Sequence, residues 1–491
     1  MSRRIIALAT LLSAFVLAPS FAAMPDVFYN GARQSIAASE ARLLAIAGRA
    51  EPGFSLGELF PIQLEAWRLE LITDKGPRLI EADNLGERLY DIHVVQSTRA
   101  WDIVLDSDAR GIRERIEGVT RLELKGEPNP EKSLEVWVSW EGVTQLKGEI
   151  RRWAERAGVS VKVIDVPSIK SKLITVLRGG GKVPDLVMIQ SDYIPDLVEA
   201  GALQAIDGLR LPESGSKGKQ AFALGGRLLA APFYCDTQLV FYSTTLIRGK
   251  PELDWNLGDM ERLAVASGAS TPCAWNAYSA YWFLPFVIGF GKDTIIDQGG
   301  TMHVMDPAYG KALHYLSDAI TRGFMQPMER DAMMAYFTSG KTAFILSGSY
   351  SLPEFKRLGI PFGVAPFPLV SPGGKRVAPL LDYKGWAVTR TSKSPVLARR
   401  LIQYLSGAEL QATFCASQGK LPANDEAWSL LPDQGEYLAT LKASYDAGVT
   451  VPPEPVYGIF KNALWKLLRL YLGGQMSSDD MLAALAVIMN E

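Results

Sequence analysis

The clearest pattern in the chain starts with LEVWVSWEGVTQLKGEIRRWAERAGVSVKVIDV, residues 134–166, and continues through GGGKVPDLVMIQSDYIPDLVEAGALQAI, residues 179–206. Three short apolar segments alternate here with two helical patterns, as units of parallel β-sheet require. The expected strands are residues 134–138, 159–163 and 186–189. The third is apolar throughout, which is typical of a strand covered on both faces. The pattern predicts an open α/β domain.

Two predicted helices lie between the expected strands. The first helix places its apolar residues three and four positions apart, at Val143, Leu146, Ile150 and Trp153, and Gly158 can end it. The second has Ser168 as an expected N-cap and a buried stripe of Ile169, Leu173 and Val176. Three consecutive glycines from Gly179 then end the helix.

Polar and aromatic residues follow two of these strands. Trp140 and Glu141 come after the first strand, and Asp192 and Tyr193 come after the third. Ligands of open α/β sheets bind beyond the carboxyl ends of the strands. We therefore expect one rim of the sheet to carry two carboxylates and two aromatic rings.

This order of segments resembles the N-terminal lobe of the extracellular solute-binding proteins, of the maltose-binding type that serves ABC importers. The similarity covers residues 132–491 and continues through GGRLLAAPFYCDTQLVFYSTTLI, AYFTSGKTAFILSGSYSL, FGVAPFPLV, YKGWAVTRTSKSPVLARRLIQYLSGAELQ and LWKLLRLYLGGQMSSDDMLAAL. The resemblance implies an α/β, two-lobed periplasmic-binding-protein fold of type II with hinge crossovers. Lobe 1 would take residues 132–240 and 387–435, and lobe 2 would take residues 241–386 and 436–491.

The same resemblance implies that a carbohydrate, of the oligosaccharide class, binds between the lobes and is delivered to the membrane permease of an ABC transporter. Aromatic rings suit the apolar faces of a sugar, and carboxylates accept hydrogen bonds from its hydroxyls. The expected ligand-binding residues are Trp140, Glu141, Asp192, Tyr193, Tyr234, Asp236, Tyr281, Trp282, Tyr350 and Trp386. We expect Asp236→Ala and Trp386→Ala each to weaken binding at least tenfold without unfolding the protein.

Two positions depart from the maltose-binding pattern. Ile189 stands where maltose-binding relatives carry a tryptophan, and Tyr193 stands where they carry an arginine. The resemblance therefore implies the fold and a carbohydrate ligand, but not maltose itself.

The sequence leaves two other functions open, a ligand sensor and a glycoside hydrolase. A sensor would present its closed form to a membrane receptor instead of a permease. A glycoside hydrolase would need two carboxyl groups about 5 to 9 Å apart. Asp192 and Asp236 are candidates for such a pair, but the sequence does not give the distance between them. RGGGKV lacks the spacing of a phosphate-binding loop, and there is no G-x-S-x-G motif. We expect a monomeric binding protein, not an enzyme, with no cofactor.

The N-terminus has the composition of a secretory signal peptide over residues 1–23. Arg3 and Arg4 precede an apolar run, and Ser20 and Ala22 supply small residues for cleavage. A membrane anchor is the alternative, but the run is shorter than the roughly 20 residues that a bilayer crossing needs. We expect a periplasmic or extracellular protein. The formal net charge of the chain, −2, argues against a nucleic-acid partner.

Residues 24–130 lie outside the resemblance and are predicted to form a small α+β accessory unit. Residues 33–47 look helical, and later segments alternate apolar and polar residues as strands do. The linker GEPNPEKS, residues 126–133, would end the unit. An accessory binding module, a contact to a membrane partner and a structural appendage remain open as its role.

The remaining sequence features are predicted to be structural. The apolar stretch 278–291 contains Pro285 and is too short for a membrane span, so we expect a buried helix. The three cysteines are Cys235, Cys273 and Cys415, and a bridge between the first two stays possible. The three histidines lack metal-ligand spacing, so no metal site is expected.

Overall fold

The computed structural model describes residues 26–29, 32–34, 44–45, 52–55, 64–81, 91–96, 101–107, 112–128, 133–209, 211, 216–432 and 436–490. The residues of the expected signal peptide lie outside these ranges. The chain divides into two compact units. The first holds the described residues up to Ser133 and two short later segments that begin at Arg151 and Gly208, and the second holds the rest.

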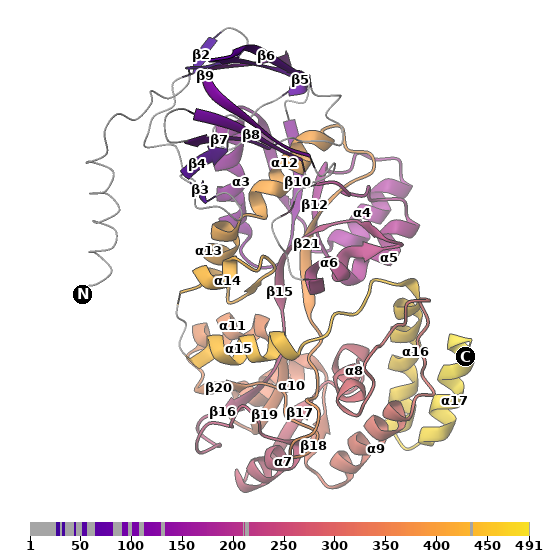
Figure 1. Cartoon of the computed structure of the whole chain (residues 1–491). Helices are drawn as coiled ribbons and strands as arrows, with labels where there is room; N and C mark the ends of the chain where they lie inside the picture. Colours follow the sequence, from indigo (N-terminus) through magenta and orange to yellow (C-terminus); the bar gives the residue numbers. More distant parts are fainter. Residues whose placement is uncertain are drawn as a thin grey trace, which may run out of the picture. The chain divides into compact units, whose positions relative to one another are not determined.

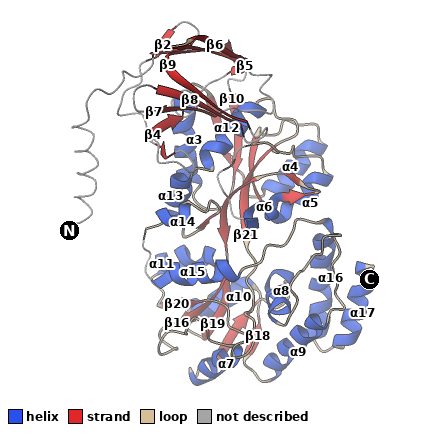
Figure 2. Ribbon diagram, in the orientation of Figure 1, coloured by secondary structure: helices blue, strands red, loops and turns tan. Residues whose placement is uncertain are grey.

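The described part of the first unit is mainly one sheet of nine strands (Figures 1 and 2). The strands are β1 (Asp26–Tyr29), β2 (Ala32–Gln34), β3 (Leu44–Ala45), β4 (Pro52–Ser55), β5 (Leu64–Thr73), β6 (Gly76–Glu81), β7 (Asp91–Gln96), β8 (Trp101–Ser107) and β9 (Ile112–Pro128). Their order is β2-β1-β9-β8-β7-β4-β3, with β5 paired to both β6 and β9. Strands β1 and β9 are parallel, and the other described pairs are antiparallel.

This sheet corrects two expectations. The helix predicted over residues 33–47 is wrong at residues 33–34 and 44–45, which belong to β2 and β3; the rest of that span lies outside the described ranges. Pairing of β2 with β1, and of β3 with β4, overrides the local helical pattern. The predicted linker is shorter than expected, because β9 continues to Pro128 in its pairing with β5.

The first sheet of the second unit confirms the predicted alternation. Its strands are β10 (Ser133–Val138), β11 (Ser160–Asp165), β12 (Leu186–Gln190), β15 (Ala231–Asp236), β21 (Asp382–Val388) and β22 (Leu421–Pro422). They lie in the order β11-β10-β12-β21-β15-β22. Strands β10 and β12 are parallel, whereas β21 runs antiparallel to both of its neighbours.

Helices surround this sheet (Figure 1). They are α3 (Val143–Ala157), α4 (Ile169–Arg178), α5 (Ile194–Glu199), α6 (Ser216–Phe222), α12 (Pro395–Leu405), α13 (Ala408–Gln418) and α14 (Ala427–Leu430). The apolar stripes predicted for α3 and α4 are buried at Leu146, Ile150, Ile169 and Leu173. Ser168 differs from the expectation, because its side chain makes no capping hydrogen bond. A short hairpin, β13 (Ala223–Leu224) and β14 (Arg227–Leu228), follows α6.

A second sheet forms the other lobe of this unit. Its strands are β16 (Gln238–Ser243), β17 (Thr271–Trp275), β18 (Met325–Pro327), β19 (Thr342–Gly348) and β20 (Phe362–Ala365), in the order β18-β17-β19-β16-β20. The helices of this part are α7 (Leu257–Ala266), α8 (Ala280–Gly289), α9 (Pro307–Thr321), α10 (Arg330–Thr338), α11 (Leu352–Leu358), α15 (Glu436–Ala447), α16 (Pro455–Leu472) and α17 (Ser478–Met489).

Helix α8 is the buried apolar helix that the sequence predicted. Trp282, Phe283, Leu284, Phe286 and Val287 are all buried in the core of the second lobe. None of the described helices has the length and hydropathy of a membrane span. The structure thus assigns this stretch to protein packing.

The chain crosses between the two sheets at Thr237, because β15 ends at Asp236 and β16 begins at Gln238. It returns after β20 and enters the first sheet at Asp382. The expected lobe boundaries, after residues 240 and 386, therefore lie a few residues late. Both β16 and β21 are buried throughout most of their length, so no change of composition marks the crossings.

The cysteine side chains lie in the core of the protein. All three cysteines are buried as free thiols, so Cys235 and Cys273 do not pair in this structure. The residues that the structure describes contain no group of histidine, cysteine and carboxylate side chains that could hold a metal ion.

Candidate functional site

Several strand ends of the first sheet meet at one edge. Strands β12 and β15 both run antiparallel to β21, so their carboxyl ends lie beside the start of β21. Asp236, at the end of β15, is the register partner of Asp382. Cys235 pairs with Leu421 in β22, which brings the neighbouring Lys420 to Asp236.

Asp236 is the centre of a buried ion network. Its carboxylate accepts hydrogen bonds from Lys420 Nζ at 3.0 and 3.1 Å and from Ser349 Oγ at 2.7 Å, and Lys384 Nζ lies 3.6 Å away. The side chain of Asp236 is 1% exposed and that of Lys420 is 0% exposed. Burial alone would raise the pKa of Asp236, but Lys420, Lys384 and the Ser349 hydroxyl hold it below its ordinary value.

Lys384 extends the network to a second buried acid. Its Nζ contacts Asp382 Oδ2 at 2.5 Å, and only 5% of its side chain is exposed. Burial raises the pKa of Asp382 to about 6, with Asp236 adding to the shift and Lys384 opposing it. Burial alone would lower the pKa of Lys384, but Asp382 and Asp236 raise it, so the ammonium stays charged.

The loop after β10 adds Glu141 and Trp140. Glu141 Oε1 lies 3.2 Å from Lys420 Nζ, and its Oε2 accepts a hydrogen bond from the Tyr234 hydroxyl at 3.4 Å. The ring centres of Trp140 and Tyr193 are 6.1 Å apart, and Lys384 Nζ lies 5.8 Å from the Trp140 ring. Trp140 has φ +67°, a left-handed conformation that is uncommon for a large side chain. Both aromatic rings are partly exposed.

The second lobe contributes to the same region. Ser349 lies in the short helix η2 (Ser349–Ser351) that follows β19; its hydroxyl binds Asp236 and also accepts a hydrogen bond from the backbone N–H of Thr237. Burial raises the pKa of Tyr281, and the charges of Asp382 and Asp236 raise it further. Lys461 in α16 contacts Asp192 Oδ2 at 2.9 Å. Asp192 belongs to η1 (Ser191–Tyr193), which follows β12 of the first sheet.

Several buried polar atoms of the two lobes have no hydrogen-bond partner among the described residues. They include Asp192 Oδ1 after β12, Thr237 Oγ1 after β15, Asn276 Oδ1 after β17 and the Tyr281 hydroxyl on α8. Buried polar groups in native proteins nearly always have partners, so such a group calls for a water or a ligand. Each of these four atoms can accept a hydrogen bond. The lysines of the network, in contrast, already bind carboxylates.

The structure separates the ten predicted site residues into two groups. Eight lie in or beside the ion network: Trp140, Glu141, Asp192, Tyr193, Tyr234, Asp236, Tyr281 and Tyr350. Trp386 has no exposed surface and packs against Phe233 with 5.6 Å between ring centres. Trp282 is 6% exposed and packs edge-on against Tyr281 inside the second lobe. Both tryptophans thus pack inside the protein, although Trp386 Nε1 has no hydrogen-bond partner among the described residues. Their direct contact with a ligand stays a prediction.

Sequence reasoning missed four charged residues of the region: Asp382, Lys384, Lys420 and Lys461. Asp382 and Lys384 do leave a signal, because two opposite charges two positions apart in a strand point to the same face. Lys420 and Lys461 leave no signal in the sequence that we recognise, because their partners are distant along the chain.

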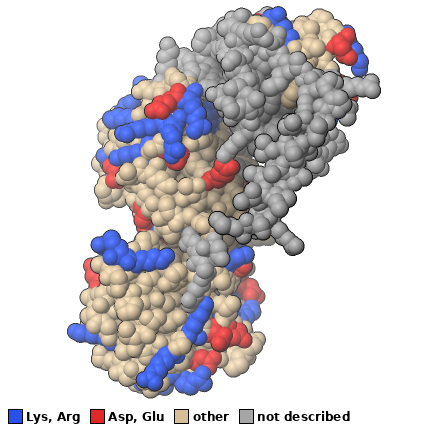
Figure 3. Space-filling model, turned by 90° about the vertical axis from the view of Figure 1, so that its left-hand side faces the viewer, with Lys and Arg blue, Asp and Glu red and all other residues tan. Residues whose placement is uncertain are grey.

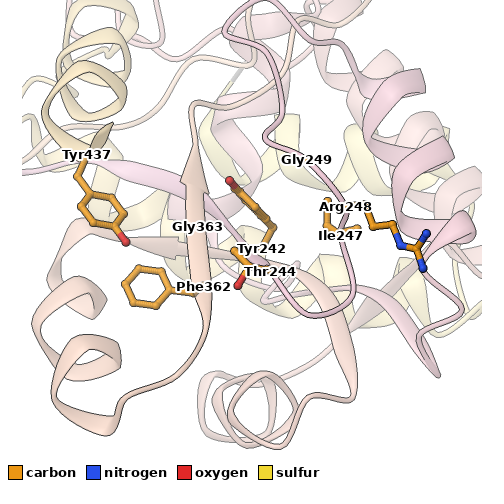
Figure 4. Close-up of a pocket in the computed structure, with 8 residues that line it drawn as sticks. All are labelled: Tyr242, Thr244, Ile247, Arg248, Gly249, Phe362, Gly363 and Tyr437. Carbon is orange, nitrogen blue, oxygen red and sulfur yellow. The ribbon is translucent and has the colours of Figure 1, made fainter. Parts of the chain in front are cut away.

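A separate pocket of about 470 Å³ lies in the second lobe (Figure 4). Tyr242, Ile247, Phe362 and Tyr437 are among the residues that line it. None of the ten predicted residues lines this pocket. On the molecular face drawn in Figure 3, acidic side chains stand beside the basic ones in both lobes.

Comparison with known proteins gives the family. Residues 139–412 match the model of the bacterial extracellular solute-binding proteins. The chain belongs to this family. Its members bind solutes and are not enzymes, so this solute-binding protein is not an enzyme either.

The solute-binding protein has relatives among characterised sequences. It is 25% identical over 314 residues to the maltodextrin-binding protein MdxE of Bacillus subtilis, covering 60% of this chain and 75% of that protein. It is 26% identical over 333 residues to the maltooligosaccharide ABC transporter solute-binding lipoprotein of Streptococcus pneumoniae serotype 4, covering 63% of this chain and 76% of the other.

Solved structures confirm the two-lobed type II fold. The maltotriose-binding protein of Thermus thermophilus superposes with a TM-score of 0.62 at 22% identity, covering 73% of this chain and 99% of that protein. The maltose-binding protein MalE of Listeria monocytogenes superposes with a TM-score of 0.64 at 20% identity, covering 73% and 97%. About a quarter of this chain thus lies outside the shared fold.

Proposed function

We propose that this solute-binding protein captures a carbohydrate between its two lobes and delivers it to the permease of an ABC importer. One observation carries the proposal: in a chain of this family, carboxylates and aromatic rings lie where strand ends of the first lobe contact Ser349 and Lys461 of the second lobe. The related proteins that bind maltodextrin and maltooligosaccharides support a carbohydrate of the oligosaccharide class.

The chemistry of the site suits a ligand with many hydroxyl groups. The unpartnered oxygens of Asp192, Asn276 and Tyr281 can accept hydrogen bonds from hydroxyls. A hydrogen bond to a charged group contributes about 1.5 to 3 kcal/mol, so Asp192 alone can change the affinity more than tenfold. The partly exposed rings of Trp140 and Tyr193 supply flat apolar surfaces for a sugar ring.

Closure follows from contacts on both sides of the ligand. A ligand shifts the open and closed populations only by its better affinity for the closed form. Asp192 and Trp140 belong to the first lobe, whereas Tyr281 and Asn276 belong to the second, so a sugar that contacts both groups favours closure. The closed, loaded protein is then the form that a permease would recognise. Export by the N-terminal signal peptide would place the protein outside the inner membrane. We propose that it acts there as a monomer.

A thermal-shift screen against mono-, di- and oligosaccharides, polyols and glycerol phosphates tests the proposal. A ligand at 100 times its dissociation constant stabilises the native state by about 2.7 kcal/mol. We expect at least one saccharide to raise the melting temperature and to be recovered unchanged.

Two variants make the screen specific. Asp192→Asn should reduce the shift, whereas Asp331→Asn should leave it intact, because the side chain of Asp331 is 98% exposed on α10. Absence of a shift with every saccharide would reject the proposed ligand class. Co-purification with a permease, as against a receptor, tests the delivery step.

A further inference from the structure

We infer that Lys461 is a specificity-determining residue: its ion pair with Asp192 closes one end of the ligand site and restricts the site to short saccharides. The inference rests on the proposed function, because it concerns the length of the carbohydrate. The pair joins α16 of the second lobe to η1 of the first lobe, with 2.9 Å between Lys461 Nζ and Asp192 Oδ2.

Burial places this pair at the rim of the site. The side chains of Lys461 and Asp192 are 34% and 33% exposed. At the other side of the network, Lys420 and Asp236 are 0% and 1% exposed. The polar region therefore runs from a closed inner end at Lys420 to a solvent-accessible end at Lys461.

Asp192 spans the boundary between these two environments. Its Oδ2 binds Lys461, whereas its Oδ1 is buried without a partner among the described residues. The inner oxygen is thus available to a ligand while the outer oxygen holds the second lobe. A sugar bound on the inner side can use Asp192 without disturbing the ion pair.

The sheet sets the spacing of the two carboxylates. Asp236 ends β15 and Asp192 follows β12, and only β21 lies between these two strands. Neighbouring strands are about 4.8 Å apart, so the two carboxylates stand on strands separated by about 10 Å. A saccharide that spans from Asp236 to Asp192 and continues outward meets the Lys461–Asp192 ion pair.

Lys461 is held in place by more than one contact. Besides the ion pair, its Nζ lies 4.9 Å from the ring centre of Tyr457, one turn earlier in α16. Tyr457 is buried in the core of the second lobe. A partly exposed ion pair changes an equilibrium by about two- to fivefold, and the bulk of the side chain adds a steric barrier to longer ligands.

Calorimetric titration with maltose and maltohexaose tests the inference on the full chain. Lys461→Ala should raise the affinity for maltohexaose relative to maltose at least threefold over the wild-type ratio. Lys461→Arg should restore the wild-type ratio, because arginine can keep the ion pair. Lys466→Ala is the matched control: this lysine is exposed on the same helix, and its substitution should leave the ratio unchanged. An unaltered ratio in Lys461→Ala overturns the inference.

The ligand-free protein supplies an independent measurement. Because the pair joins the two lobes, Lys461→Ala should show a larger radius of gyration in solution scattering than Lys466→Ala. Equal radii would show that the pair does not hold the lobes together. If the wild-type protein binds neither saccharide, the proposed length selection is rejected, whereas the thermal-shift screen still tests the ligand class and scattering still decides the lobe contact.

Discussion

At the scale of single residues, Asp236 is the acid on which the buried lysines depend. Removal of one partner from a buried ion pair leaves an uncompensated charge and costs about 3 to 5 kcal/mol. Asp236→Ala would leave Lys420 with Glu141 and Lys384 with Asp382, but both ammonium groups would lose their shared partner. We therefore expect this variant to lower the free energy of unfolding by several kcal/mol, which replaces our sequence-based expectation that it would affect binding alone.

Urea denaturation measures this change. Asp331→Ala serves as the control, because substitution of an exposed surface acid usually changes stability by less than about 0.5 kcal/mol. Equal stability of the Asp236 and Asp331 variants would mean that the network does not contribute to folding.

Asp382 predicts a pH dependence of stability. Burial raises its pKa to about 6, whereas an unfolded chain has a pKa of about 3.9 for this group. The native state thus binds the Asp382 proton more tightly than the unfolded state does. The stabilisation of the native state by this proton is complete below pH 4 and is lost as the pH rises through 6. The loss amounts to about 2 to 3 kcal/mol. The difference in unfolding free energy between wild type and Asp382→Asn should fall by this amount from pH 4 to 7.5. A constant difference across that range would contradict the shifted pKa.

At the scale of elements, strand β21 depends on a glycine where it meets β15. A Cβ atom added at Gly385 would lie 2.6 Å from the carbonyl oxygen of Ala231 and 2.7 Å from the Phe222 ring. Gly385→Ala must push the two strands apart, and overpacking of this kind costs about 1 to 3 kcal/mol. Because Asp382 and Lys384 lie on the same strand, we expect ligand affinity to fall as well.

A second glycine provides the control. A Cβ added at Gly148 in α3 meets no atom within 4 Å, so Gly148→Ala should stabilise the protein by up to about 1 kcal/mol through helix propensity. Denaturation curves of the two alanine variants should therefore move in opposite directions. A shift of both in the same direction would show that strand separation is not the cause.

The elements also show what sequence could predict. The order of strands and helices from β10 to β12 was predictable, because each has a periodic apolar pattern of its own. The helix expected over residues 33–47 failed, because pairing with other strands decided the structure of its ends. Lys384 and Lys420 were missed, since lysine is usually exposed, and their burial depends on Asp236, which the fold brings from a distant part of the chain.

At the scale of the whole molecule, the division into two compact units predicts how a ligand changes unfolding. All ten residues that we predict for the site belong to the second unit. A ligand stabilises only the part of the molecule whose folded state binds it, by about 2.7 kcal/mol at 100 times the dissociation constant. Scanning calorimetry of the full chain should therefore show two transitions, of which a saccharide shifts only the one with the larger enthalpy, because enthalpy scales with the number of residues. A single transition that shifts with the saccharide would mean that the two units unfold as one and that the accessory sheet is coupled energetically to the ligand site.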